Sequence, residues 1–180
     1  MNMILFAALM AVQAAPAATS PVVAPACPQK SQVDCNWLTV DSTAKTATFA
    51  LISGQTALNG GLNFNGFNEG KLTLTVPAGW TVVLRFTNKD QNLPHSAEVV
   101  DTVKPMPAGP VDPPAFPRAM TVKLMQGLGS GDSDTVRFVA NKAGSYMIFC
   151  GVPGHGLAGM WIRLKVSATD KRPTLVASST

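Results

Sequence analysis

The sequence predicts one all-β domain built as a sandwich or barrel of short strands. Short segments rich in Val, Thr, Leu and Phe recur along the chain, and turn residues separate them. Few segments have the hydrophobic period of a helix. Hydrophobic residues make up 46% of the chain and charged residues 13%, which is enough apolar material for a buried core.

The expected strands follow one another along the chain. Residues 71–76 alternate polar and apolar side chains, as a half-buried strand does, and Pro77-Ala78-Gly79 then turns the chain into the next strand. A second turn is expected at 141–144, between two later strands. The complete set of expected strands is 37–40, 45–52, 71–76, 80–86, 95–100, 134–139, 145–149 and 160–166.

Two segments are expected to be loops. Residues 59–70 contain too much Gly and Asn for a continuous strand. Residues 104–118 are rich in proline, which cannot donate to a β-ladder, so an irregular connection or an edge cover is expected there. This second loop is either a rigid spacer or a surface that binds a partner.

The feature most informative about function follows the strand at 145–149. Cys150, His155 and Met160 are spaced as Cys-x4-His-x4-Met in a glycine-rich segment, and Met160 begins the next expected strand. A thiolate, an imidazole and a weak thioether, completed by a second imidazole, are the ligands of a mononuclear blue copper site. Zinc sites take Cys, His and carboxylate ligands but not methionine.

The second imidazole can come from one place only, because the chain has 2 histidines. The other histidine is His95, in Asn92-Leu93-Pro94-His95-Ser96. We therefore predict one copper ion, cycling between Cu(I) and Cu(II), with His95, Cys150, His155 and Met160 as its ligands. Ser96 either bonds across to the Cys150 loop or is a surface hydroxyl.

Apolar residues surround the predicted ligands. This set consists of Pro94, Val152, Pro153, Leu157 and Ala158. A dry environment disfavours the more highly charged Cu(II) and so raises the reduction potential. If His155 reaches the surface, the same residues form a docking patch; otherwise they are ordinary loop packing.

The N-terminal sequence indicates export. Residues 3–12 form an apolar stretch of signal-peptide length that is too short to span a bilayer, and small residues that fit a cleavage site follow it. We expect a signal peptide or short apolar segment at 1–17, a linker at 18–36, the main domain at 37–168 and a C-terminal tail at 169–180.

The 3 cysteines agree with export. Cys27 and Cys35 could close a small disulfide loop in the linker, which leaves Cys150 as the unpaired thiol. We expect a periplasmic location or the extracytoplasmic face of a membrane. Attachment through the N-terminus stays open.

Charge and histidine content exclude several classes of function. The net charge is +4, without a basic run interleaved with aromatic residues, so nucleic acid binding is not expected. Multicopper enzymes need additional histidines for further copper centres, so we expect no enzymatic activity. A carrier of single electrons is the leading hypothesis, and a periplasmic protein that binds or delivers copper is the alternative.

Three segments resemble the cupredoxins, most closely the sulfocyanins, with rusticyanin next. They are Phe64-Asn65-Gly66-Phe67, the segment 88–96 that contains Leu93-Pro94-His95-Ser96, and the segment 150–161 with the Cys, His and Met. The resemblance covers residues 45–167 and implies a Greek-key β-sandwich with one type 1 copper ion. It also implies transfer of single electrons in a respiratory chain outside the cytoplasm, through transient docking near His155. We expect a monomer.

Overall fold

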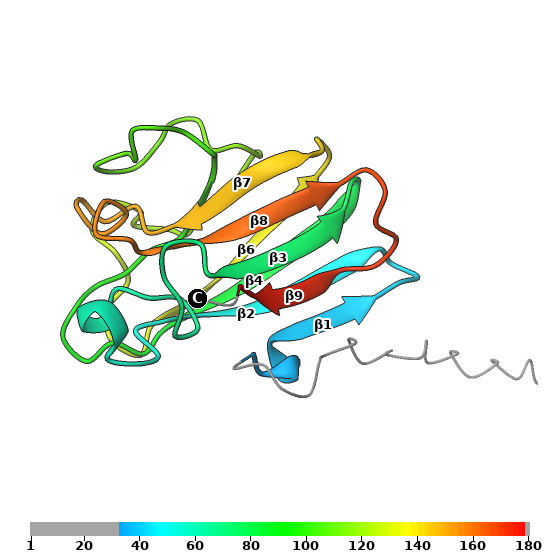
Figure 1. Ribbon diagram of the computed structural model, residues 1–180. Coiled ribbons are helices and arrows are strands. Elements are labelled where there is room, and N and C mark those ends of the chain that lie inside the picture. Colours follow the sequence, from blue (N-terminus) through cyan, green and yellow to red (C-terminus); the bar gives the residue numbers. More distant parts are fainter. Residues whose placement is uncertain (1–32, 179–180) are drawn as a thin grey trace, which may run out of the picture.

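Two β-sheets pack face to face in the computed structural model, which describes residues 33–178 (Figure 1). One sheet has the order β1-β2-β4-β6, with β1 (Leu38–Asp41), β2 (Thr46–Ser53), β4 (Trp80–Asn88) and β6 (Ser133–Ala140). The other has the order β5-β7-β8-β3-β9, with β5 (Glu98–Asp101), β7 (Gly144–Phe149), β8 (Trp161–Ser167), β3 (Leu72–Pro77) and β9 (Thr174–Ala177). Two short 3-10 turns, η1 (Cys35–Trp37) and η2 (Leu58–Gly61), complete the described elements.

Each sheet mixes parallel and antiparallel pairs. β2 runs parallel to β4, and β3 runs parallel to β8, while the other neighbours are antiparallel. Strands that are far apart in sequence therefore lie side by side, as Greek-key connections require. The expected all-β Greek-key sandwich is confirmed.

Alternation along the strands builds the core between the sheets. In β3, Leu72 and Leu74 are fully buried while Thr73 is half-buried. In the facing sheet, Leu84 and Phe86 of β4 are buried and Arg85 between them is exposed. Burying one such large apolar side chain contributes about 1.5–3 kcal/mol, so the pattern fixes which face of each strand points inward.

The strand that was expected to start at His95 starts instead at Glu98. The backbone of His95 pairs with Leu128 in an isolated bridge, and the Ser96 N–H points to the sulfur of Cys150. These groups are therefore not available for pairing with β7. The ladder between β5 and β7 begins at the pair Glu98 and Phe149. The short strand β9, which pairs with β3, was not indicated by the sequence.

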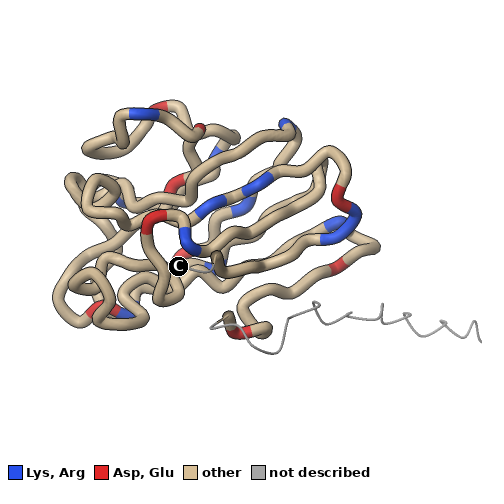
Figure 2. The backbone as a smooth tube through the Cα atoms, viewed as in Figure 1, with Lys and Arg blue, Asp and Glu red and all other residues tan. Residues whose placement is uncertain are grey.

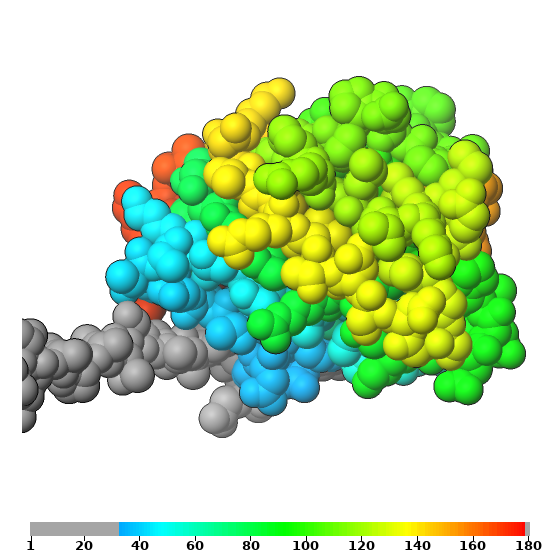
Figure 3. All heavy atoms as spheres, turned by 180° about the vertical axis from the view of Figure 1, so that it is seen from behind, coloured from blue at the N-terminus to red at the C-terminus, as the bar shows by residue number. Residues whose placement is uncertain are grey.

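The proline-rich segment forms an edge cover. The Ala115 N–H donates to the Val99 carbonyl, and the Val99 N–H donates to the Ala119 carbonyl, so this segment satisfies the free edge of β5. Met106 and Val111 pack on the outer face of the sheet, over Val100 and nearby apolar side chains. From behind, the segment between β5 and β6 lies beside β6 (Figure 3).

Several expectations fall outside the described residues. They include the signal peptide or apolar segment at 1–17, most of the linker at 18–36, and Cys27 of the possible Cys27–Cys35 disulfide. Within 33–178, no helix combines the length and the apolar character that a membrane span needs.

Candidate metal centre

The segments that carry the predicted ligands lie at one end of the sandwich, where β7 ends and β8 begins (Figure 1). Cys150 follows the last residue of β7, and Met160 precedes the first residue of β8. The loop between them carries His155, and His95 comes from the connection between β4 and β5. Two separate segments of the chain therefore supply the site, and both are anchored to buried strands.

Three donor atoms converge in this site. One ligand atom each of His95, Cys150 and His155 lies within 4.8 Å of the others. Sγ of Cys150 is 3.5 Å from Nδ1 of His155, and the two imidazole rings have centroids 5.1 Å apart. Spacings of this size leave room for one metal ion between the three groups, since Cys and His ligands lie about 2.0–2.3 Å from a bound metal.

His95 is oriented by a contact on the far edge of its ring. Nε2 of His95 lies 3.0 Å from Oδ2 of Asp90, while Nδ1 is buried without a hydrogen-bond partner. A buried polar atom without a partner costs free energy, so it needs an explanation. A metal ion at this position supplies one, because ligating histidines usually donate their second ring N–H to a carboxylate or carbonyl.

The protonation state of Asp90 decides which nitrogen of His95 carries the proton. Burial raises the pKa of Asp90, but hydrogen bonds from the N–H groups of Asn92 and Leu93 and from His95 outweigh this and lower it. An ionised carboxylate can only accept, so Nε2 of His95 is the donor. Burial also lowers the pKa of His95, against the opposing effect of Asp90. The neutral ring then offers the lone pair of Nδ1.

Asp90 was not identified from the sequence. It is placed by a buried network, in which Oδ1 of Asn88 accepts a hydrogen bond from the Asp90 N–H. The amide nitrogen of Asn88 donates to the carbonyls of Leu93 and Leu128, which lie on either side of the His95 backbone. The only signal in the sequence was that Asp90 lies five positions before His95.

Cys150 and His155 are also tuned by burial. Burial raises the pKa of the Cys150 thiol, and hydrogen bonds from backbone N–H groups, among them that of Ser96, oppose this effect. Burial and the nearby His95 lower the pKa of His155. The imidazoles are therefore in their metal-binding form, whereas the thiol must lose a proton when a metal binds.

Ser96 connects the two segments of the site. Its backbone N–H lies 3.4 Å from Sγ of Cys150, its hydroxyl donates to the Leu124 carbonyl at 2.7 Å, and the same oxygen accepts from the Gly151 N–H at 3.1 Å. Ser96 is fully buried. The sequence left open whether Ser96 bonds to the Cys150 loop or is a surface hydroxyl, and the structure shows the bond to the loop.

The loop from 150 to 160 is closed at its base by backbone hydrogen bonds. The Cys150 N–H donates to the Met160 carbonyl, and the Met160 N–H donates to the His155 carbonyl. Met160 is fully buried beside these partners. Gly154 has a φ of 85°, and a Cβ at Gly156 would collide with the ring of Phe149. At these two positions the loop needs glycine.

The apolar residues around the site differ in exposure. Val152 packs against the core, whereas Pro94, Pro153, Leu157 and Ala158 are exposed and His155 is half-buried. Tyr146 has a structural role, because its hydroxyl donates to the Lys142 carbonyl at 2.8 Å. Phe149 is fully buried, but Trp161 is only half-buried.

The chain is similar to known proteins over most of its described length. The family model of the sulfocyanin (SoxE) domain matches residues 33–177. A sulfocyanin of Sulfolobus acidocaldarius is 30% identical over 144 residues, which are 75% of this chain and 70% of that protein. A crystal structure of a rusticyanin variant matches with a TM-score of 0.51 and 23% identity, over 68% of this chain and 78% of that one. This last likeness concerns the fold.

Proposed function

Because the chain belongs to the sulfocyanin family of cupredoxins, we propose that it carries single electrons between redox proteins outside the cytoplasm. Cupredoxins are electron-transfer proteins and not enzymes, and they bind one type 1 copper ion. The chain is a cupredoxin electron carrier of this kind. The ligands, the location and the partners belong to the proposal.

We propose His95, Cys150, His155 and Met160 as the copper ligands. The observation that carries this assignment is the buried Nδ1 of His95, which has no hydrogen-bond partner and belongs to a group of converging donor atoms with Cys150 and His155. Met160 would supply the weak thioether ligand, in line with its spacing and its burial.

Bound copper supplies a one-electron couple between Cu(I) and Cu(II). The protein's part is to hold the donor atoms so that they move little when the charge changes. Asp90 holds the His95 ring through Nε2, and the backbone N–H of Ser96 points at Sγ of Cys150. Hydrogen bonds to the thiolate and a dry surrounding both favour the reduced, less charged state.

His155 offers the route between the centre and the surface. Among the proposed ligands, His95, Cys150 and Met160 are fully buried and His155 is half-buried. The exposed residues Pro153 and Leu157 surround it with apolar surface. Transient redox complexes bury small areas, under about 1,200 Å² in total, so a small apolar surface is enough for such a contact. We propose that respiratory-chain redox proteins dock here.

The test is reconstitution of the purified chain with Cu(II). We expect an intense blue absorption band from thiolate-to-copper charge transfer and a reversible one-electron wave in voltammetry. Colourless binding of Cu(I), with rapid loss to a chelator, would overturn the carrier and favour copper delivery. The full burial of Cys150 and His95 argues against rapid exchange.

A further inference from the structure

A groove of about 650 Å³ lies on the outer face of the five-stranded sheet, away from the core. Side chains of β3, β7 and β8 form its floor, and the segment after β5 contributes to its wall. The lining residues used below are Glu69, Lys104, Ser145, Trp161, Arg163 and Lys165. In Figure 2 this sheet faces the viewer, with basic positions along β8 and at the start of β3.

The groove is positively charged. Lys104, Arg163 and Lys165 line it, and Glu69 is the one carboxylate among its lining residues. Lys71, a further cation next to the lining residues, lies 3.5 Å from Glu69, so cations outnumber carboxylates there. Lys165 has a loose contact of 3.7 Å with Asp170, and both side chains are largely exposed. A pair of this kind contributes little, so the charge of Lys165 stays available to a partner.

Arg163 is fixed in place within the groove. Its Nε donates to the Gly70 carbonyl at 2.9 Å, and its guanidinium carbon lies 5.5 Å from the centre of the Trp161 ring. Within residues 33–178 it has no carboxylate partner. A preorganised arginine beside a half-buried tryptophan is the combination that dominates many protein interfaces.

The groove is connected to the metal centre by two aromatic residues. Trp161 follows Met160 and is paired with Phe149, which precedes Cys150. The Phe149 ring packs close to Gly156 of the ligand loop. Trp161 packs against the cluster that contains Phe149, with Val100 and Met147. A continuous set of packed side chains therefore runs from the ligand loop to the groove.

We propose that this groove is a second docking surface, which seats the carboxylate-rich face of an acidic redox protein. The proposal rests on the electron-carrier function above and adds a surface separate from the rim of His155. Complementary charge steers encounters and can raise association rates 10- to 1,000-fold at low salt. One electron passes between the two redox centres, the donor is oxidised and the acceptor reduced, and no bond forms or breaks.

The experiment uses the Cu(I)-loaded chain, because the reduced metal is diamagnetic and amide signals can be assigned. A glutamate-rich peptide serves as the probe for an acidic partner in a nitrogen-15 NMR titration at low salt. We expect chemical-shift changes at Lys104, Ser145, Arg163 and Lys165, and their loss when salt is added. Changes confined to the ligand loop, or no changes, would overturn the proposal.

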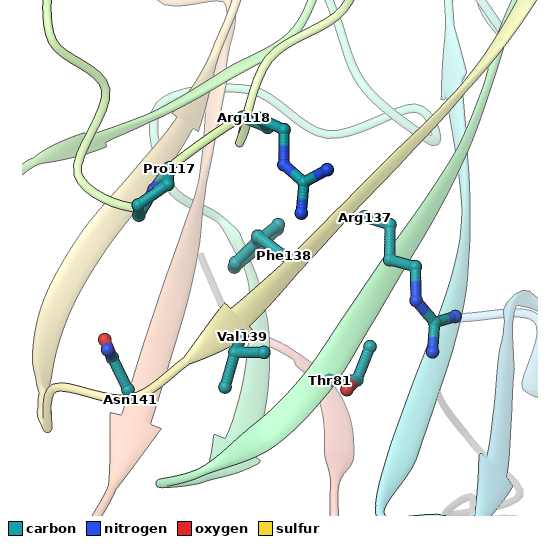
Figure 4. Close-up of a pocket in the computed structure, with 7 residues that line it drawn as sticks. All are labelled: Thr81, Pro117, Arg118, Arg137, Phe138, Val139 and Asn141. Atoms are coloured by element: carbon teal, nitrogen blue, oxygen red, sulfur yellow. The ribbon is translucent and has the colours of Figure 1, made fainter.

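Charge reversal provides the matched comparison. The double variant Lys104→Glu/Lys165→Glu should weaken peptide binding by at least roughly tenfold, since it reverses two lining charges. The control is Arg118→Glu/Arg137→Glu, which makes the same change in net charge at two exposed residues that line a smaller pocket next to β6, on the other sheet (Figure 4). It should leave binding within about twofold, a loss far below that expected from steering at the groove. An equal loss in both variants would show general charge attraction and overturn a specific groove.

Two further outcomes are decisive. Tighter binding to vesicles of phosphatidylglycerol and phosphatidylcholine, with the same residues shifted, would assign the groove to a membrane surface and overturn a protein partner. The blue band of the Cu(II)-loaded variants separates this proposal from the proposed function. If the band is absent from the unmodified chain, the carrier function fails. If the band is present and the peptide does not bind, the carrier function stands and only the proposed docking in the groove is overturned.

Discussion

The carboxylate of Asp90 lies 3.0 Å from Nε2 of His95, on the ring edge opposite the unpartnered Nδ1. This contact sets both the tautomer and the direction of the proposed ligand. Metal sites depend on such outer contacts as well as on the ligands themselves.

Asp90→Asn should weaken copper binding by about 10- to 100-fold. One oxygen of Asp90 accepts from the backbone and the other contacts His95, whereas an amide has a single oxygen. The measurement is competition with a chelator of known affinity. Asp170→Asn, which alters an exposed carboxylate, should leave the affinity unchanged. Equal affinity of the Asp90 variant and the unmodified chain would show that the contact does not orient the ligand.

Cys150→Ser should abolish the blue colour, since the charge-transfer band requires the thiolate. The residue is a free, buried cysteine, and serine is close to it in size, so the fold should persist. Visible absorption of the Cu(II)-loaded variant checks the colour, and circular dichroism checks the fold. A folded variant that stays blue would refute the assignment of Cys150.

Met160→Gln should keep the copper and lower the reduction potential, because an oxygen donor favours Cu(II) more than a thioether does. Voltammetry of the loaded variant measures the change. Met125→Gln is the matched control, since that side chain is 55% exposed and should not affect the potential. An unchanged potential in the Met160 variant would mean that Met160 is not the axial ligand.

Ser96→Ala should destabilise the protein by about 1–3 kcal/mol, because it leaves the Gly151 N–H and the Leu124 carbonyl without their buried partner. Chemical denaturation of the metal-free chain measures the free energy of unfolding. The control Ser133→Ala removes only an exposed contact with Thr87 and should cost far less. Similar losses in both variants would contradict the bridging role of Ser96.

Glu98 should make the protein less stable as the pH rises. Burial raises its pKa from 4.5 to about 7, with the charge of Asp112 adding to this and a hydrogen bond from the Val111 N–H opposing it. Between these values the folded state binds more protons than the unfolded state, so the free energy of unfolding falls with increasing pH. The loss should reach up to about 3 kcal/mol above pH 7.

The check on Glu98 is denaturation of the metal-free chain at pH 4.5 and at pH 8. His95 and His155, whose pKa values are lowered by burial, raise the stability of the metal-free chain with increasing pH in every variant compared here. Against this common background, Glu98→Gln should abolish the opposite contribution of Glu98 to the difference between the two conditions. Glu69→Gln, at an exposed carboxylate, should preserve it. The same pH dependence in the Glu98 variant and in the unmodified chain would show that Glu98 makes no such contribution.

The sequence contained most of the strands and the ligand loop because both depend on local patterns. Leu72, Thr73 and Leu74 alternate visibly in burial, and Cys150, His155 and Met160 have a fixed spacing. Asp90 was missed because its role depends on how a loop folds back on His95, which no period or spacing encodes. The same reason explains the late start of β5, where a sulfur atom competes for the N–H of Ser96.

The strand β9 could not be predicted from the sequence for a different reason. Thr174–Ala177 is short and lies at an edge, and only Leu175 of its side chains is buried. Such a segment contributes little apolar periodicity. Its pairing with β3 depends on the neighbour that the fold supplies.

The hydrogen bond from the Cys150 N–H to the Met160 carbonyl separates the loop from the sheet below it. Exposed positions between these two residues, such as Pro153 and Leu157, can change while the flanking strands keep their register, provided that His155, Gly154 and Gly156 are kept. The loop can therefore be redesigned independently of the two sheets. Substitutions at these loop positions could adjust the absorption spectrum and the reduction potential of the centre without changes to the two sheets.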